Sequence, residues 1–210
     1  MPPIYVRTVC DLRPAARAGR RSRRTTGSVG RMRARWWSFL GTVLAYAAAA
    51  AWAAISGPDP FPTHFGLSGQ PDSWTPRAEA VPLHAAITAG IAVLFAGLAL
   101  AAPRIPARIV NTPRRDYWLA PEHRPAFDAI VSGFLLWIGG LILVLQAATI
   151  VVTIIDPAET AAKSTITFLF VVSLVGSIGY LIWLLTHPPK RSTTTARGVR
   201  PKRSGNRSRR

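Results

Sequence analysis

The sequence predicts an all-α polytopic membrane protein, with four transmembrane helices and disordered basic termini. Of its 210 residues 49% are hydrophobic, yet the formal net charge is +17. These two properties agree if apolar and charged residues occupy separate blocks, and four blocks are almost free of charge. Each block is about as long as the roughly 20 helical residues that cross a bilayer core of about 30 Å. The four blocks are residues 36–55, 81–101, 127–155 and 165–185.

The spanning elements are predicted to be helices, because the blocks lack the alternation of polar and apolar residues that a barrel wall requires. Asp128 is the exception to the absence of charge, and it lies near enough to the start of its block to reach the interface. Each block contains small residues that would let helices approach closely. These are Ala47 to Ala51, Gly90 and Gly97, Gly139 and Gly140, and Ser173, Gly176 and Ser177.

The distribution of basic residues predicts the orientation. Ten lie in the segment up to Arg35, five between the second and third blocks, and nine from Lys190 to the end. A four-helix topology puts all of these on one side and leaves Arg77 and Lys163 on the other. The positive-inside rule then predicts a multi-pass protein of the cell membrane with both termini in the cytoplasm. Cys10 is the only cysteine, so no disulfide can form within the chain.

Residues 1–35 are predicted to be a disordered basic tail, residues 36–186 the four-helix membrane domain, and residues 187–210 a second disordered basic tail. Two alternatives concern the N-terminus. Translation could begin at Met32, which would make the first 31 residues an artefact, or the first block could be a signal peptide cleaved near Ser56. The block is longer than a signal peptide's apolar region, which favours a transmembrane helix.

The basic tails are expected to contact the lipid bilayer through anionic headgroups. Nucleic acid is the alternative partner, because arginine clusters neutralise phosphates. The C-terminal tail has no aromatic residues among its charges, so no specific nucleic-acid binding is expected.

The loop after the first block, residues 58–74, is rich in turn-forming residues and is expected to be irregular. His64, Asp59 and Asp72 could bind a metal or a proton, or the loop could be purely structural. One histidine with scattered carboxylates lacks ligand spacing, so no metal site and no cofactor are predicted. The candidate residues of this loop, for a ligand or for structure, are Pro62, His64, Phe65, Gly69, Pro71, Asp72 and Trp74.

The loop between the second and third blocks contains too many prolines for a long helix. It could fold as a clamp against the helix ends, with two aromatic residues dipping into the headgroup region, or form a docking surface for a protein partner. Its candidate residues are Asn111, Pro113, Tyr117, Trp118, Pro121 and Glu122.

Two motifs in the first loop resemble those of a known protein family. The sequences PTHF at 62–65 and GQPDSW at 69–74, after a first membrane helix, resemble the bacterial membrane family of domain of unknown function sixteen-forty-eight. Residues 111–122 look like a segment of that family's stand-alone members. The resemblance extends over residues 36–155.

The resemblance implies a relation to SdpI-like immunity proteins, which carry this domain at their N-terminus. Those proteins protect a bacterium from a secreted toxic peptide and hold a transcriptional repressor at the membrane. This chain departs from them in two ways: it has fewer membrane helices, and Arg77 stands where a lysine is expected.

No catalytic residues are predicted, because no intramembrane pair supplies an acid, base or nucleophile. His84 and Asp128 belong near opposite faces of the membrane. We therefore expect a non-enzymatic protein with an immunity, sensing or scaffold role. A small transporter or transporter component is the alternative, although ionisable residues near the midplane are not evident. The bias towards Ala, Arg, Gly and Pro suggests a bacterial source.

Overall fold

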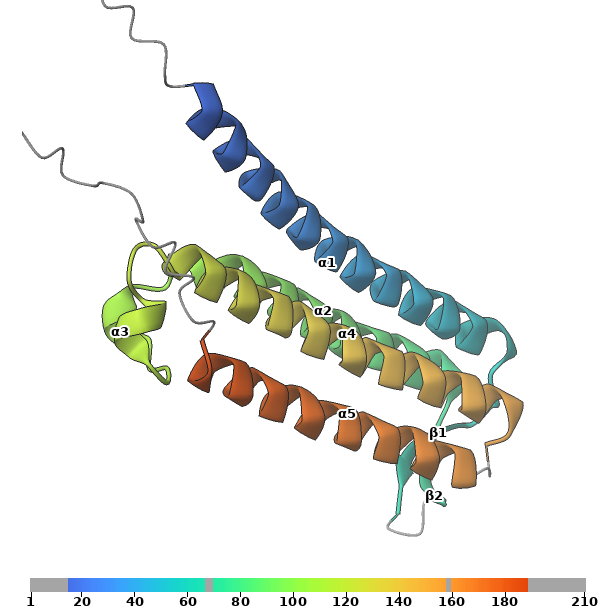
Figure 1. The fold of residues 1–210 in the computed structure, drawn as a ribbon. Helices are drawn as coiled ribbons and strands as arrows, with labels where there is room; N and C mark the ends of the chain where they lie inside the picture. Colours follow the sequence, from blue (N-terminus) through green and yellow to red (C-terminus); the bar gives the residue numbers. More distant parts are fainter. Residues whose placement is uncertain (1–14, 67–69, 158–159, 189–210) are drawn as a thin grey trace, which may run out of the picture.

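Four long helices form the protein in the computed structural model, which describes residues 15–66, 70–157 and 160–188 (Figure 1). They are α1 (Ala15–Ser56), α2 (Arg77–Ala101), α4 (Arg124–Ile155) and α5 (Ala161–Thr186). All four are long and apolar enough to cross a membrane. The predicted all-α multi-pass architecture is confirmed.

The helices begin earlier than the apolar blocks, because polar residues continue a helix beyond its membrane-buried part. The difference is largest in α1, which begins at Ala15, directly after Pro14. Residues 15–35, which the sequence assigned to a disordered tail, belong to α1 in the structure; they contain no proline and include the strong helix formers Ala and Arg. The rest of the predicted tails, residues 1–14 and 189–210, lies outside the described residues.

Helix α4 is the centre of the bundle. It packs against α1, α2 and α5, whereas α5 has α4 as its main neighbour. Figure 1 shows α2 and α4 lying between α1 and α5. The main core is formed by α1, α2, α4 and one residue of the hairpin. Its buried members are Phe39, Tyr46, Ala49, Ala50, Ala53, Phe61, Ala80, Val81, Ala99, Leu136, Leu143 and Ile150.

Gly139 lets three helices meet closely. A Cβ atom at this position would lie 2.7 Å from Cβ of Phe95 and 3.0 Å from Cε2 of Phe39. By contrast, a Cβ at Gly90 or Gly97 would meet nothing within 4 Å. The prediction of a close helix contact is thus confirmed for Gly139 and wrong for the two glycines of α2, which face open space.

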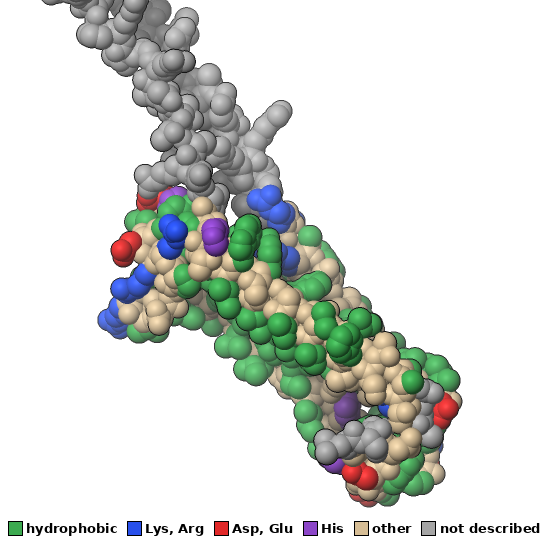
Figure 2. Space-filling model, turned by 60° about the horizontal axis from the view of Figure 1, so that its bottom comes forward, with side chains coloured by type: hydrophobic (Ala, Val, Ile, Leu, Met, Phe, Trp, Pro, Cys, Tyr) green, Lys and Arg blue, Asp and Glu red, His purple; other side chains and the backbone are tan. Residues whose placement is uncertain are grey.

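The surface of the bundle matches a bilayer. Large apolar side chains remain exposed along the helices, among them Trp37 (70% exposed), Val93 (72%) and Ile155 (71%). Figure 2 shows charged side chains gathered at the two ends of the described body, with hydrophobic side chains between them. Since lipid tails are as apolar as these side chains, their exposure costs nothing in a membrane.

The loop between α1 and α2 is a β-hairpin, so the prediction of irregular structure is wrong. Strand β1 (Phe61–Phe65) pairs antiparallel with β2 (Pro71–Thr75), with shifts of register around His64. Two isolated strands always leave edges, and edge positions tolerate proline, which is why Pro62 and Pro71 do not prevent pairing. Residues 67–69 at the tip lie outside the described residues.

The loop between α2 and α4 folds at the opposite end of the bundle. It contains two short 3-10 helices, η1 (Ala102–Arg104) and η2 (Ala107–Ile109), and one turn of α-helix, α3 (Arg115–Trp118). Five arginines of this loop therefore lie at the same end as Arg35, whose guanidinium reaches Ala129 near the start of α4. We call this the basic end and the opposite one the hairpin end.

Candidate functional site

The hairpin is attached to the bundle through its first strand. Phe61 is 9% exposed and belongs to the main core. At the far end of β1, the ammonium of Lys163 lies 4.6 Å from the centre of the Phe65 ring. The same ammonium donates to the carbonyl of Pro157 at 2.6 Å, and Lys163 is only 8% exposed. The hairpin is thus held from both α2 and the start of α5.

Arg77 ties the base of the hairpin to the end of α1. Its Nη1 donates to the carbonyl of Gly57 at 2.6 Å and to that of Ile55 at 3.4 Å. Its backbone N–H donates to Oδ1 of Asp59 at 3.1 Å. A cation at the C-terminus of a helix satisfies free carbonyl groups and opposes the helix dipole. Arg77 therefore fixes the turn from which the hairpin rises.

The far face of the hairpin presents polar and aromatic side chains to the outside. Nδ1 of His64 lies 2.5 Å from Oδ1 of Asp72, and both side chains are more than half exposed. Trp74 is 46% exposed on the same strand as Asp72. We call His64, Asp72 and Trp74 the hairpin triplet. This arrangement places an imidazole–carboxylate contact and an aromatic ring on a well-anchored support.

The structure separates the three residues considered as metal ligands. His64 and Asp72 meet, but Asp59 is bound to the backbone of Arg77. Within the described ranges, no group of three or more His, Cys, Asp or Glu side chains could hold a metal ion. Of the remaining candidates, Pro62 pairs with Trp74 and Pro71 with Phe65 in the hairpin, while Gly69 lies outside the described residues.

At the basic end, Trp118 fastens the inner loop to α5. Its indole Nε1 donates to the carbonyl of Leu185 at 2.8 Å, and the side chain is 2% exposed. It packs in a second core with Phe127 and Leu185. The prediction that this tryptophan dips into the headgroup region is therefore wrong, because the unpaired carbonyls at the end of α5 offer its N–H a buried partner.

Some of the other inner-loop candidates hold the loop against the helix ends, and the others lie exposed on its surface. Tyr117 stacks on His123 with ring centres 4.0 Å apart. Arg124 pairs with Asp128 at 2.7 Å and donates to the carbonyl of Ile105, which closes the loop against α4. The exposed candidates are Asn111, Pro113, Pro121 and Glu122.

A polar cluster inside the bundle was missed by the sequence analysis. Nε2 of His84 lies 3.3 Å from Nε2 of Gln146, and the His84 ring stacks on Tyr46 at 6.3 Å. The hydroxyl groups of Tyr46 and Thr88 are also buried. Because His84 and Thr88 are four residues apart on one helix face, their spacing within an apolar block was the available signal.

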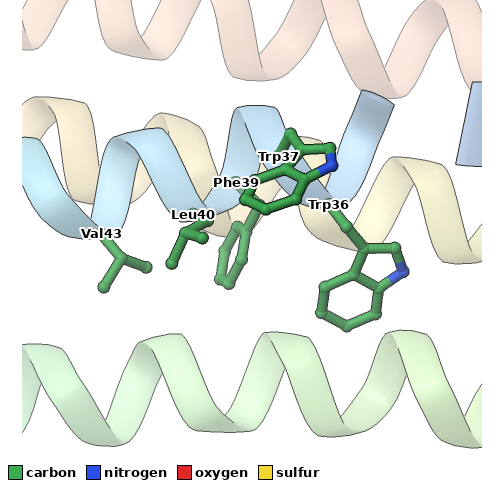
Figure 3. A pocket seen from close by; sticks show the side chains of 5 residues that line it. All are labelled: Trp36, Trp37, Phe39, Leu40 and Val43. Atoms are coloured by element: carbon green, nitrogen blue, oxygen red, sulfur yellow. The ribbon is translucent and has the colours of Figure 1, made fainter. Parts of the chain in front are cut away.

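Two hollows open on the bundle near α1. A shallow one is lined by Trp36, Trp37, Phe39, Leu40 and Val43. Figure 3 shows Trp36, Phe39 and Val43 extending from α1 towards α2. The larger hollow, of about 1020 Å³, runs between α1 and α5 over α4, and we call it the α1–α5 groove.

Comparison with known proteins gives one family. The family model described as "Domain of unknown function (DUF1648)" matches residues 32–88. No curated protein and no solved structure matches the chain. The matched residues include the membrane part of α1, the hairpin and about half of α2, whereas the inner loop lies outside them. The resemblance predicted from the hairpin motifs is confirmed over residues 32–88, which match the model of this domain.

Proposed function

We propose that the chain is a non-enzymatic protein of a bacterial cytoplasmic membrane, which uses its hairpin to recognise a peptide outside the cell in an immunity or sensing role. Both termini lie in the cytoplasm in this proposal. The observation that carries it is a firmly anchored hairpin with an exposed hairpin triplet. Binding residues commonly lie on loops that a stable scaffold positions.

The chemistry of the triplet suits a peptide. Aromatic rings contribute large contact area at little entropic cost, and tryptophan is among the residues that dominate interface energies. The neighbouring imidazole and carboxylate supply a donor and acceptors for peptide groups. Because Phe61, Lys163 and Arg77 already fix the hairpin, little ordering is left to oppose binding.

A scaffold role at the opposite end is part of the same proposal. The exposed residues of the inner loop, Asn111, Pro113, Pro121 and Glu122, surround the buried Trp118. Trp118 links this loop to α5 and so holds the surface in one conformation. A cytoplasmic protein partner of the immunity or sensing pathway would dock there.

The test is a deletion strain challenged with a panel of envelope-active peptides. We expect the deletion to raise sensitivity to at least one peptide and the wild-type gene to restore tolerance. Changing the hairpin triplet together, by His64→Ala, Asp72→Ala and Trp74→Ala, should abolish that restoration. An exposed polar contact such as that of His64 with Asp72 contributes about 1 kcal/mol or less to stability, so the variant should reach the membrane at the wild-type level.

A matched control replaces exposed residues elsewhere, Trp37→Ala and Trp183→Ala, and should protect like the wild type. In a Cys10→Ser background, a single cysteine at Ser73 should be labelled from outside intact cells and one at Asn111 should not. Full protection by the hairpin variant, or no peptide that distinguishes the deletion strain, would contradict the proposed function.

A small transporter component is the second candidate, and the polar cluster of His84, Gln146, Tyr46 and Thr88 favours it. Polar side chains inside a membrane bundle often mark solute pathways. This candidate predicts flux of an amino acid, sugar or ion in proteoliposomes, lost in His84→Leu and kept in the hairpin-triplet variant. Absence of flux over such a panel would remove it.

A further inference from the structure

The α1–α5 groove is wide because its two walls hardly touch. Helices α1 and α5 each pack on α4, which forms the floor. On the α5 side, a Cβ at Gly176 would meet nothing within 4 Å, although this residue lines the groove. The groove of about 1020 Å³ is therefore open beside α5. In a bilayer such space is filled by lipid or by another helix.

The groove is mostly apolar and about as long as one leaflet is thick. Apolar side chains such as Leu141, Val144 and Leu184 form most of its surface, with small residues between them. From Ile130 to Val144 the floor extends over 14 helical steps, or about 21 Å. This is about half of the 40–45 Å thickness of a bilayer with its headgroups. The groove thus has the length of one leaflet.

Arg35 lies at the basic end of the groove. Its Nη1 donates to the carbonyl of Ala129 at 2.5 Å, and the side chain is exposed. The guanidinium rests over Gly133, where any Cβ would collide with it. One helical turn earlier, Arg31 is exposed on the same face of α1.

The charge of Arg35 is not balanced by the chain as described. Among the described residues, the ion pair of Arg124 with Asp128 lies at this end and the contact of His64 with Asp72 lies at the hairpin end, and neither includes Arg35. A guanidinium has five N–H donors in a planar fork that matches phosphate oxygens. A positive charge at the interface end of an apolar groove of one leaflet's length is complementary to an anionic phospholipid.

We propose that the α1–α5 groove binds one anionic phospholipid from the leaflet at the basic end, with its phosphate on Arg35 and an acyl chain along the floor of α4. Gly133 allows the guanidinium to lie low enough to meet the phosphate, and Arg31 reaches the outer part of the headgroup. A lipid fits better than α1 or α5 of a second copy, because neither of these helices, which flank the groove, contains an acid to pair with Arg35.

Two pairs of variants test the two halves of this site. Arg35→Gln removes the charge and Arg35→Lys keeps it. Gly176→Phe fills the groove from α5, while Gly179→Phe is its matched control, since a Cβ there also meets nothing within 4 Å and the residue does not line the groove. Each protein is purified in mild detergent, and lipid retained per protein is counted by native mass spectrometry after exposure to phosphatidylglycerol or phosphatidylcholine.

We expect the wild type to retain one phosphatidylglycerol molecule in preference to phosphatidylcholine. Arg35→Gln should reduce that preference roughly fivefold or more, and Arg35→Lys should restore part of it. Gly176→Phe should lower retention of both lipids, while Gly179→Phe behaves like the wild type. Equal retention of both lipids by the wild type, which needs no variant to fold, would overturn the proposal. So would a dimer that Gly176→Phe dissociates, because the occupant would then be a second copy.

Discussion

Replacing Gly139 by alanine is expected to destabilise the bundle by about 1–3 kcal/mol, the usual cost of overpacking. The new methyl group would lie 2.7 Å from Cβ of Phe95 and 3.0 Å from the ring of Phe39. The Phe95 atom is attached directly to its backbone and cannot rotate away, so α2 must move from α4. The change should appear as a lower midpoint of unfolding in detergent, followed by loss of helical circular dichroism.

Gly90→Ala is the matched control for this experiment. A Cβ at Gly90 meets nothing within 4 Å, and alanine is a better helix former than glycine by about 1 kcal/mol. The control should therefore leave stability unchanged or raise it. If Gly139→Ala is as stable as Gly90→Ala, the close approach of α4 to α1 and α2 is wrong.

Replacing Trp118 by alanine is expected to cost about 3–5 kcal/mol, as for other buried tryptophans. The variant would leave a cavity beside Phe127 and would remove the hydrogen bond to the carbonyl of Leu185. Since that bond joins the inner loop to α5, we also expect protease cleavage of the loop to become faster. The measurements are thermal unfolding in detergent and limited proteolysis from the basic end.

Two further variants separate packing from hydrogen bonding at this site. Trp118→Phe keeps most of the buried ring and loses the N–H, so it should cost about 0.5–1.5 kcal/mol. Trp37→Ala removes a tryptophan that is 70% exposed and should change stability little. Equal effects of Trp118→Ala and Trp37→Ala would contradict the buried position of Trp118.

The sequence predicted the membrane spans well, but it predicted less well the residues at which the helices begin and end. Long apolar blocks leave no alternative to helices in lipid, and the four helices are present. Apolar content could not show that α1 begins at Ala15, because helix propensity and the absence of proline, not burial, extend it. The hairpin was missed for a related reason: its prolines and glycines indicate turns, while its pairing depends on Phe61 entering the core.

Which candidate residues are buried or in contact depends on which helix lies at the centre of the bundle. The sequence does not show this. Gly139 and Gly90 occupy similar apolar surroundings in the sequence, but α4 packs against the three other long helices and a Cβ at Gly90 would meet nothing within 4 Å. Trp118 was expected in the headgroup region, yet its indole N–H donates to the carbonyl of Leu185 inside the bundle. His84 and Gln146, 62 residues apart, meet only because α2 packs on α4. The hairpin motifs were a better guide, because the resemblance of residues 32–88 to the family depends on short local sequence.

Helix α5 contributes no residue to the main core, which α1, α2, α4 and Phe61 complete without it. It packs on α4 and, through Leu185, in the second core. Two polar links add to this packing, Trp118 to Leu185 at one end and Trp137 to Ser177 at 2.9 Å further along. The apolar contacts among α1, α2 and α4 do not need α5. These three spans therefore form one packing unit, and the docking of α5 onto α4 is a separable step of folding.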